Sequence, residues 1–363
     1  MNTFSAVNYS PKSFYAITFF LLFLSVVACQ KNDNGVQSSG EWLVPSNEVR
    51  DGGPGKDGIP SVDNPEFIEV NAVSNLSDND LVVGVKVGEE IKAYPHPILD
   101  WHEIVNDEIG GQSLALTYCP LTGTGIGWNR MVNGVETEFG VSGLLYNSNL
   151  IPYDRNSDSY WSQMRLDCVN GDLIQTDIEV IPVIETTWAT WKRLYPNSKV
   201  MSTNTGFSRD YQVYPYGNYR TDDRLIFPVS NTDNRLSNKE RVLGVIVGDA
   251  VKAYAFNNFA NGVSFITDEI GDKSLIIVGN ISQNYIVVFE RTLADGSLLN
   301  PVVEPMSDLG GTGVLKDAEG NVWSIFGEAI SGPRMGEQLT IPTSYIGYWF
   351  SWAAFYPNLE LYR

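Results

Sequence analysis

Short runs of apolar residues, bounded by turn residues, recur along this chain of 363 residues. Residues 81–87 and 91–94 are rich in β-branched side chains and are separated by a Gly-Glu-Glu turn, which is typical of a β-hairpin. Residues 125–130 and 136–139 flank Asn133-Gly134, and the Asn-Gly step is a strong hairpin signal. The pattern therefore predicts a mainly antiparallel β-structure.

Aromatic residues at helical spacing predict two short amphipathic helices. These residues are Trp188, Trp191 and Tyr195 and, further along, Trp349, Trp352 and Tyr356. Thr186 or Thr187 begins the first helix, and Pro196 ends it. The aromatic stripe is more typical of a helix that packs on a sheet than of a cofactor site. A further short helical turn is expected from Pro97 to His102.

The second half of the chain repeats the first. Residues 81–94 return as residues 241–254, an offset of 160, and Asp107-Glu108-Ile109-Gly110 returns as Asp268-Glu269-Ile270-Gly271. The repeat predicts two homologous antiparallel β-rich lobes, related by internal duplication and each closed by one of the short aromatic helices. The expected fold class is mainly β, or α+β.

The two copies differ at the residues that can perform chemistry. The first copy carries Trp101-His102-Glu103 and Tyr118-Cys119-Pro120, whereas the second has Gly262-Val263-Ser264 and Gly279-Asn280-Ile281. This asymmetry predicts one working lobe and one supporting lobe. The expected division is an N-terminal lobe with the candidate site (47–202), a Tyr-rich connector that lies against both lobes (203–230), and a C-terminal repeat lobe without Cys or His (231–363).

The N-terminus is typical of a targeting segment. An apolar run, residues 14–27, is too short for an ordinary spanning helix and follows a lysine. It leads into Ala28-Cys29, which resembles a lipobox and predicts a lipoprotein signal peptide (1–28) and lipidation of Cys29; an ordinary signal peptide is the alternative. No aspartate follows Cys29, so we expect a lipid anchor in the outer membrane or at the cell surface. Residues 29–46 predict a flexible tether.

The charge balance limits the range of partners. The formal net charge is −19 and the isoelectric point is about 4.4. Nucleic acid is therefore not an expected partner, because phosphate binding requires clusters of Lys and Arg. The acidity permits cation binding, but solubility of an exported protein is the simpler explanation.

The two histidines of the chain, His96 and His102, lie close together in the first lobe. His96 stands between two prolines and is expected to be exposed and structural. His102 is expected to be partly buried, either as a core residue or as a catalytic group. Cys119 follows an expected strand, residues 113–118, and a nearby imidazolium would increase its thiolate fraction. Cys119, His102 and Glu103 are therefore the candidate catalytic residues.

The same residues raise the possibility of a metal site. Cys119 and His102 supply two ligands, and Glu103 or Asp107 is a possible third. A structural zinc site needs four protein ligands and a catalytic one usually three. Copper(I) accepts fewer and softer ligands, and Met164 lies in the same lobe, so copper is the metal to test first.

Two further features leave alternatives open. After lipidation of the first cysteine, Cys119 and Cys168 remain, and in an oxidising compartment they either form a disulfide or stay free. Ser142, Asn147 and Arg155 either line a cleft near Cys119 as binding residues, or Arg155 pairs with a surface carboxylate at a turn.

Several sequence blocks carry a family resemblance. They are Lys56-Asp57-Gly58-Ile59-Pro60, Lys92-Ala93-Tyr94-Pro95, Trp101-His102-Glu103-Ile104-Val105-Asn106-Asp107, Thr117-Tyr118-Cys119-Pro120-Leu121, Gly140-Val141-Ser142-Gly143-Leu144-Leu145-Tyr146-Asn147-Ser148 and Trp161-Ser162-Gln163. From about residue 46 to residue 361, the chain resembles the bacterial family called domain of unknown function 3179, whose members are often exported or lipid-anchored. Members commonly show a Cys-Pro-Leu-Cys-Gly pattern, and Thr122 occupies the second cysteine position here. A two-cysteine turn can cycle as a dithiol or hold a metal, and Cys119 alone does neither in the same way.

Two hypotheses about function follow. In the first, an exported lipoprotein uses a Cys119/His102 centre for thiol redox chemistry or to bind a soft metal such as copper. In the second, a non-enzymatic cell-surface lipoprotein binds a glycan, a peptide or a protein partner. The first hypothesis places the site in the N-terminal lobe, whereas in the second the two β-rich lobes bind the partner.

Overall fold

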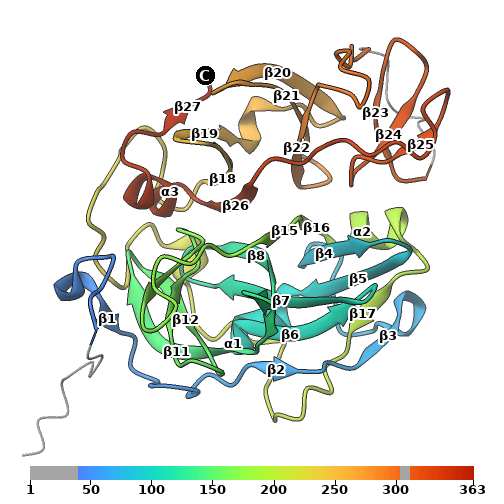
Figure 1. The fold of residues 1–363 in the computed structure, drawn as a ribbon. Coiled ribbons are helices and arrows are strands. Elements are labelled where there is room, and N and C mark those ends of the chain that lie inside the picture. The colour runs from blue at the N-terminus through green and yellow to red at the C-terminus, as the bar shows by residue number, and fades with distance from the viewer. Residues whose placement is uncertain (1–39, 303–310) are drawn as a thin grey trace, which may run out of the picture. The chain divides into compact units, whose positions relative to one another are not determined.

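The computed structural model describes residues 40–302 and 311–363, which are mainly β-strand (Figure 1). Most strand pairs are antiparallel, so the mainly antiparallel β prediction is confirmed. The α-helices of these residues are short: α1 (His96–His102), α2 (Trp188–Leu194) and α3 (Trp349–Phe355). Within this part of the chain, no helix has both the length and the apolar composition that a membrane span requires.

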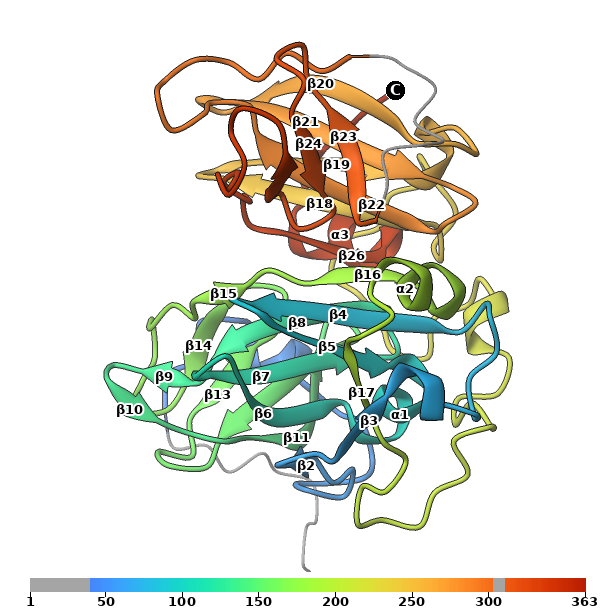
Figure 2. The ribbon, with the colours of Figure 1, turned by 90° about the vertical axis from the view of Figure 1, so that its right-hand side faces the viewer.

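The first sheet contains the hairpin expected at residues 81–94. Its strand order is β16 (Ile184–Thr187), β4 (Leu81–Val87), β5 (Glu90–Pro95), β17 (Lys199–Met201) and β3 (Phe67–Glu69). Helix α2 follows β16 directly and lies beside β16 and β4 (Figure 2). Of the two threonines expected to begin α2, Thr187 is the cap, because its hydroxyl accepts a hydrogen bond from the Thr190 backbone N–H at 3.3 Å.

The second sheet carries the strand that ends at Cys119. Its order is β15 (Val180–Ile181), β8 (Thr124–Asn129), β7 (Gln112–Cys119), β6 (Ile104–Ile109) and β2 (Val62–Asp63). Helix α1 connects β5 of the first sheet to β6 of the second, and Ile104 at the start of β6 pairs with Thr117 near the end of β7. This register places Glu103 and Cys119 at the same end of the second sheet.

The third sheet has the order β1 (Arg50–Asp51), β11 (Phe139–Tyr146), β12 (Asn149–Asp154), β13 (Tyr160–Ser162) and β14 (Asp167–Asn170). The hairpin at Asn133-Gly134 forms, but it is limited to β9 (Met131–Val132) and β10 (Val135–Glu136). The predicted pairing of residues 125–130 with 136–139 is wrong. Both edges of β8 are already occupied by β7 and β15, and β11 pairs with β12 instead.

The C-terminal half builds three sheets in a similar order. They are β26-β18-β19-β27 (Ser344–Tyr348, Arg241–Val247, Ala250–Ala255, Glu360–Leu361), β20-β21-β22 (Ser264–Ile270, Lys273–Asn280, Tyr285–Glu290) and β23-β24-β25 (Gly313–Lys316, Val322–Ser324, Ala329–Ser331). These orders match β16-β4-β5-β17, β6-β7-β8 and β12-β13-β14 of the first half. The match extends to the pairing direction, since β17 and β27 are each parallel to the second strand of their hairpin.

A tryptophan packs directly on a strand glycine in each half. The indole of Trp191 in α2 lies over Gly84 of β4, where a Cβ atom would stand 1.9 Å from ring atom Cζ3. In α3, the indole of Trp352 lies over Gly244 of β18, where a Cβ atom would stand 2.2 Å from Cζ2. Both indoles are fully buried. Only a residue without a side chain lets the helix approach the sheet this closely.

The third sheet of each half also contains a buried contact of the same kind, between a tryptophan and an aspartate. Trp161 Nε1 donates a hydrogen bond to Asp154 Oδ2 at 3.1 Å, and Trp323 Nε1 donates one to Asp317 Oδ2 at 2.9 Å. In both sheets the register shifts by a bulge immediately before the tryptophan. The structural correspondence therefore reaches beyond the segments in which the sequences are visibly alike.

The Tyr-rich connector, residues 203–230, contacts both halves. Trp101 Nε1 donates a hydrogen bond to the Val213 carbonyl at 3.0 Å, and the Tyr219 hydroxyl donates one to the Leu121 carbonyl at 2.9 Å. On the other side, Lys239 Nζ donates a hydrogen bond to the Tyr219 carbonyl at 3.2 Å. The connector is therefore part of the packed structure.

The tether prediction is wrong for residues 40–46. The Leu43 backbone N–H donates a hydrogen bond to the Val169 carbonyl at 2.9 Å, and Val44 is buried against Ile151 and Val169. The apolar residues in this short stretch add enough buried surface to order it. The predicted signal peptide and Cys29 lie outside the described residues.

We expect the substitution Gly84→Ala to lower the free energy of unfolding by about 1–3 kcal/mol, because its Cβ would overlap the Trp191 ring and force the helix away from the sheet. Urea denaturation of the purified protein measures this loss. The control is Gly262→Ala, at a position where a Cβ meets nothing within 4 Å. Equal stability of the two variants would contradict the close-packing argument.

Candidate functional site

Cys119 ends β7 inside the N-terminal half. Its side chain is 1% exposed, and its Sγ lies 3.7 Å from the Ser148 carbonyl oxygen. Burial raises the pKa of the Cys119 thiol to about 11, and the neighbouring Glu103 carboxyl raises it further. Cys119 and Cys168 are both free, so the disulfide alternative is not what the structure contains. The thiol is therefore neutral at pH 7, unlike an activated nucleophile.

A buried network of hydrogen bonds holds the loop after Cys119. The Asn149 amide donates to Thr122 Oγ1 at 2.9 Å and to Gln163 Oε1 at 2.7 Å. Gln163 in turn donates to Thr117 Oγ1 at 3.0 Å, and Thr124 donates to Gln163 Oε1 at 2.7 Å. All five side chains of this network are buried. Because every member has a partner, the network fixes the Cys119 loop in one conformation.

Thr122 occupies the position of the second cysteine in the Cys-Pro-Leu-Cys-Gly pattern that the family resemblance implies. Hydrogen bonding by Thr122 lowers the pKa of the Cys119 thiol, but burial outweighs this effect. A side chain at position 122 therefore lies directly against the Cys119 sulfur. In this chain a hydroxyl provides that contact, so the turn cannot form a dithiol.

Glu103 lies between α1 and β6 in an unusual backbone conformation. Its φ is 58° and its ψ is −31°, and its side chain is 6% exposed. A non-glycine residue in such a conformation costs on the order of 1–3 kcal/mol and is often found at functional sites. The Tyr216 hydroxyl donates a hydrogen bond to Glu103 Oε1 at 2.9 Å. Burial raises the pKa of Glu103 to about 7, which the Tyr216 hydrogen bond opposes and Asp100 reinforces.

His102 does not form the expected centre with Cys119. Its Nδ1 lies 2.8 Å from the Pro60 carbonyl oxygen, and its Nε2 lies 2.7 Å from the Tyr211 hydroxyl. Burial lowers the pKa of His102, so the imidazole is neutral at pH 7 and supplies no charge to a thiolate. The Cys119/His102 pairing is wrong because α1 directs the histidine toward the connector. Among the residues that the structure describes, no three His, Cys, Asp or Glu side chains are placed to share a metal ion.

His96 is buried, at 3% exposure, and the prediction of an exposed residue is wrong. It begins α1, and the packing of α1 on β4 and β5 encloses it. His96 Nε2 lies 3.2 Å from Glu185 Oε2, and Glu185 also pairs with Arg241 of the C-terminal half. Burial raises the pKa of Glu185, but Arg241 and His96 outweigh it and hold the pKa below its ordinary value. This buried ion pair connects the two halves.

The three predicted binding residues do not converge on a cleft. The Ser142 hydroxyl donates to the Ile151 carbonyl within the third sheet. The Asn147 amide donates to the Ala354 carbonyl of α3 at 3.3 Å. Arg155 pairs with Asp63 at 2.7 Å and with Glu138 at 2.9 Å, as the turn interpretation expected. These side chains are structural.

Three tyrosines of the connector approach Cys119, and the sequence reading did not identify them as site residues. Tyr214, Tyr216 and Tyr219 each lie close enough for the charge of a Cys119 thiolate to raise their pKa further, after burial. Arg220 follows them and binds both carboxylate oxygens of Asp100 at 2.6 and 2.7 Å. The cluster of tyrosines in the sequence was the signal that could have indicated these residues. Their position near Cys119 depends on how the connector folds.

A pocket of about 240 Å³ opens beside this cluster, and we call it the Glu103 pocket. Its polar side chains are Glu103 and Tyr216. Its wall is apolar and comes mainly from the third sheet, the Cys119 loop and the connector: Ile59, Leu121, Val141, Leu144, Leu150 and Phe227. An apolar cavity with a few converging polar groups and one carboxyl of shifted pKa is typical of a small-molecule site.

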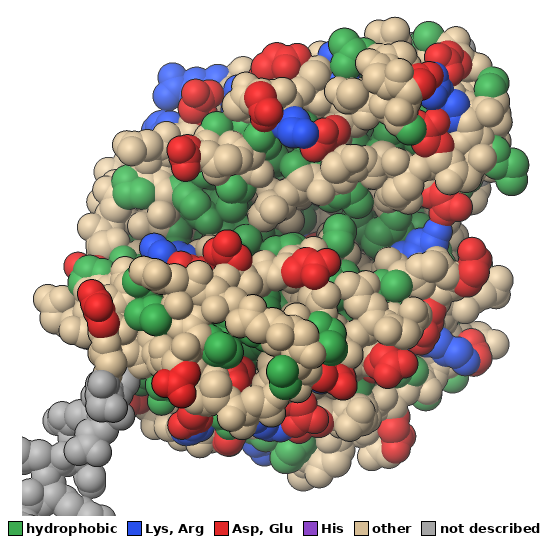
Figure 3. Space-filling view, viewed as in Figure 1, with side chains coloured by type: hydrophobic (Ala, Val, Ile, Leu, Met, Phe, Trp, Pro, Cys, Tyr) green, Lys and Arg blue, Asp and Glu red, His purple; other side chains and the backbone are tan. Residues whose placement is uncertain are grey.

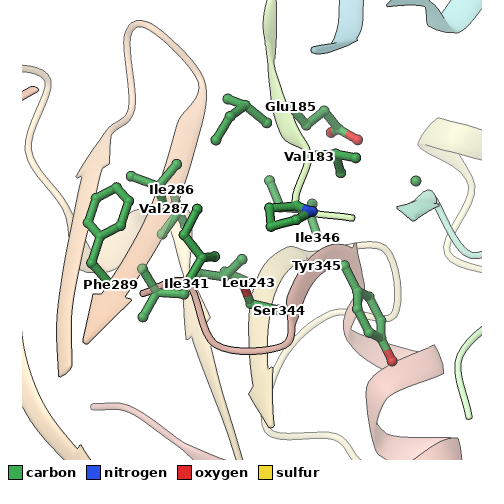
Figure 4. A pocket seen from close by; sticks show the side chains of 14 residues that line it. Val183, Glu185, Leu243, Ile286, Val287, Phe289, Ile341, Ser344, Tyr345 and Ile346 are labelled. Carbon is green, nitrogen blue, oxygen red and sulfur yellow. The ribbon is translucent and has the colours of Figure 1, made fainter. Parts of the chain in front are cut away.

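A second cavity, between the two halves, is too small for a ligand. Figure 4 shows Val183 on one side and Leu243, Ile286 and Ile346 on the other. The cavity holds about 30 Å³, which is the space of a water molecule or two. We interpret it as a packing gap between the halves.

The outer surface gives little indication of a charged partner. On the face shown in Figure 3, Asp and Glu side chains are scattered, and Lys and Arg side chains do not gather into a broad patch. Most of the basic side chains that form ion pairs contact a single carboxylate each. Lys192, for example, pairs with Asp78. The Glu103 pocket therefore remains the best candidate site.

Comparison with known proteins gives one match. A family model described as "Protein of unknown function (DUF3179)" matches residues 56–359. No curated protein and no solved structure matches the chain. The matched range includes Glu103 and the connector, whereas Gly52 and Pro54 of the pocket wall precede it.

We expect Glu103 to make the folded protein less stable as the pH rises from about 5 to 8. The pKa of Glu103 is about 7 in the folded protein against an ordinary value of 4.5, so between these values the folded state holds a proton that the unfolded state has lost. The loss amounts to about 3 kcal/mol.

Chemical denaturation of the wild type and Glu103→Gln at about pH 5 and about pH 8 measures how much Glu103 changes the free energy of unfolding. The stability of the variant relative to the wild type should increase as the pH rises, because the amide does not titrate. A difference that stays constant over this range would show that the Glu103 carboxyl is not perturbed.

Proposed function

The chain belongs to the DUF3179 family of proteins of unknown function, and we propose that its N-terminal lobe binds a small, mainly apolar molecule in the Glu103 pocket. The proposal rests on Glu103, a buried residue with a strained backbone whose carboxyl lines an apolar pocket. A core carboxyl without function would be replaced by an apolar residue at a gain in stability. Binding is therefore the simplest reason for its presence.

The state of Cys119 supports binding rather than catalysis. A buried neutral thiol is a weak nucleophile, and the imidazole that would activate it is engaged with Pro60 and Tyr211. Cys119 then serves as a small apolar residue behind the pocket. This version of the binding hypothesis replaces the glycan, peptide or protein partner with a small molecule, because the pocket is small and apolar.

We infer that the two lobes arose by internal duplication and that only the first retains a site. The matching sheet orders and the repeated glycine–tryptophan contact support a common origin. At the positions that correspond to Glu103 and Cys119, the second lobe has Ser264 and Asn280. We propose that each lobe is closed by its aromatic helix and that the C-terminal lobe supports the working one.

The proposed location follows from the sequence alone. The apolar segment that ends at Ala28-Cys29 supports an exported lipoprotein with its membrane anchor on Cys29. An outer-membrane or cell-surface position would expose the Glu103 pocket to small molecules outside the cytoplasm. Treatment of cells with a radiolabelled fatty acid tests whether Cys29 is acylated.

We expect the neutral fluorophore N-phenyl-1-naphthylamine to bind the mature protein with a rise in fluorescence. Leu144→Trp should weaken this binding at least about tenfold, because Leu144 is half-buried in the pocket wall and a larger ring would fill the space. Fluorescence titration measures both affinities. The control is Val135→Trp, a residue that is 59% exposed in the β9–β10 hairpin.

Unfolding curves would establish that both tryptophan variants are folded at the titration temperature. Equal affinity of the two variants, or no binding by the wild type, would overturn the proposed pocket.

Soft-metal or thiol chemistry at Cys119 is the second proposal. The specific observation in its favour is that Glu103 lies close enough to Cys119 to raise the pKa of its thiol and also lines the pocket. A copper(I) ion would have to displace the thiol proton to bind. His102 is not available to the copper ion, so of the predicted Cys119/His102 pair only the Cys119 thiolate would bind it.

We expect copper(I), if this second proposal holds, to bind the wild type and Cys168→Ala equally and Cys119→Ala about tenfold more weakly. Competition against a chromophoric copper(I) chelator measures the three affinities. Identical affinities would exclude Cys119 as a copper ligand.

A further inference from the structure

We infer that the ligand of the Glu103 pocket is an apolar molecule that carries one positively charged nitrogen and that this nitrogen pairs with the Glu103 carboxylate. The inference rests on the proposed binding function and adds the chemical class of the ligand. It follows from the balance of charge around the pocket.

The described wall of the pocket contains one carboxyl group and no cationic side chain. Tyr216 donates a hydrogen bond to one carboxylate oxygen of Glu103, at 2.9 Å, and the structure gives no hydrogen-bond donor to the other oxygen. The remaining wall residues are apolar or are glycines. An ionised Glu103 therefore lies in the cavity with one of its two carboxylate oxygens lacking a hydrogen-bond donor among the described residues.

Two basic residues that adjoin the site residues in the sequence, Arg220 and His102, are engaged with other groups. The Arg220 guanidinium binds both oxygens of the buried Asp100 and lies 4.0 Å from the centre of the Tyr214 ring. His102 is neutral and is held between the Pro60 carbonyl and the Tyr211 hydroxyl. Asp100 is itself an acid and adds repulsion to Glu103. No resident group of the described residues therefore neutralises Glu103.

A ligand cation would supply the missing partner. A carboxylate buried without a partner is costly, and pairing with a cation in a cavity shielded from water recovers much of that cost. The aromatic rings of Tyr216 and Phe227 line the same cavity and offer faces that attract cations. Leu121, Leu144 and Leu150 would contact the apolar body of the ligand. A pocket of about 240 Å³ admits a molecule the size of a naphthylalkylamine.

The two other ligand classes fit less well. An anion would meet the charge of Glu103, with no cation in the wall to offset it. A neutral hydrogen-bond acceptor would require Glu103 to hold its proton, and its binding would weaken above about pH 7. A cation behaves in the opposite way, because its binding strengthens as Glu103 loses the proton. The pH dependence therefore separates these classes.

The test compares 2-(1-naphthyl)ethylamine with 2-(1-naphthyl)ethanol, which has nearly the same shape and no charge. The amine stays protonated throughout, since an alkylammonium group has a pKa of about 10.4. Isothermal titration calorimetry at about pH 5.5 and 8.5 gives the affinities of both compounds for the wild type, Glu103→Gln and the control Glu108→Gln, an exposed carboxyl outside the pocket.

We expect the wild type and Glu108→Gln to prefer the amine at least about tenfold at the higher pH. This preference should shrink at the lower pH and disappear in Glu103→Gln. Equal affinities of amine and alcohol at the higher pH, or a preference that persists in Glu103→Gln, would overturn the assignment of a cationic ligand. In that case binding of the neutral fluorophore and its loss in Leu144→Trp would still support the pocket, so the two proposals fail separately.

Discussion

The close contact between a helix tryptophan and a strand glycine determines how each half of this protein is built. Trp191 on Gly84 brings α2 against the β4–β5 hairpin, and Trp352 on Gly244 does the same for α3. The contact buries a large aromatic surface that would otherwise be exposed, and it fixes the helix at one height above the sheet. Because β5 runs into α1 and then β6, the position of this hairpin also fixes the path of the chain to Glu103 and to the paired end of β7.

The candidate site combines a rigid loop with a strained residue. The Thr122, Asn149 and Gln163 hydrogen bonds hold the Cys119 loop, and the same enclosure raises the pKa of the thiol. Glu103 has a positive φ because it must turn the chain from α1 into β6, and this turn directs its carboxyl into the pocket. The fold thus spends stability at Glu103 and recovers it in the surrounding network, a distribution that is common around binding sites.

The two halves are joined by polar contacts as well as by apolar packing. Glu185 of the first half pairs with Arg241 of the second, and the Tyr348 backbone N–H donates to the Thr122 carbonyl at 2.7 Å. Tyr345 and Tyr356 both donate to the Met164 carbonyl. The C-terminal half therefore supports the segments that surround Cys119, although it carries no equivalent of Glu103. The connector adds the cover, which explains why the pocket wall includes Tyr216 and Phe227.

Local features of this protein can be predicted from neighbouring residues in the sequence. The runs of β-branched residues and the Asn-Gly and Gly-Glu-Glu turns located strands, and the Trp188–Trp191–Tyr195 spacing located α2, because these signals depend on neighbouring residues. The family resemblance was also readable in short motifs. Which residues form the site depends on the tertiary structure. The sequence indicated an exposed His96, yet it is buried against Glu185, and His102 contacts Pro60 and Tyr211 instead of Cys119. The approach of Tyr216 to Glu103, 113 residues away along the chain, depends on long-range packing that leaves no periodic signal in the sequence.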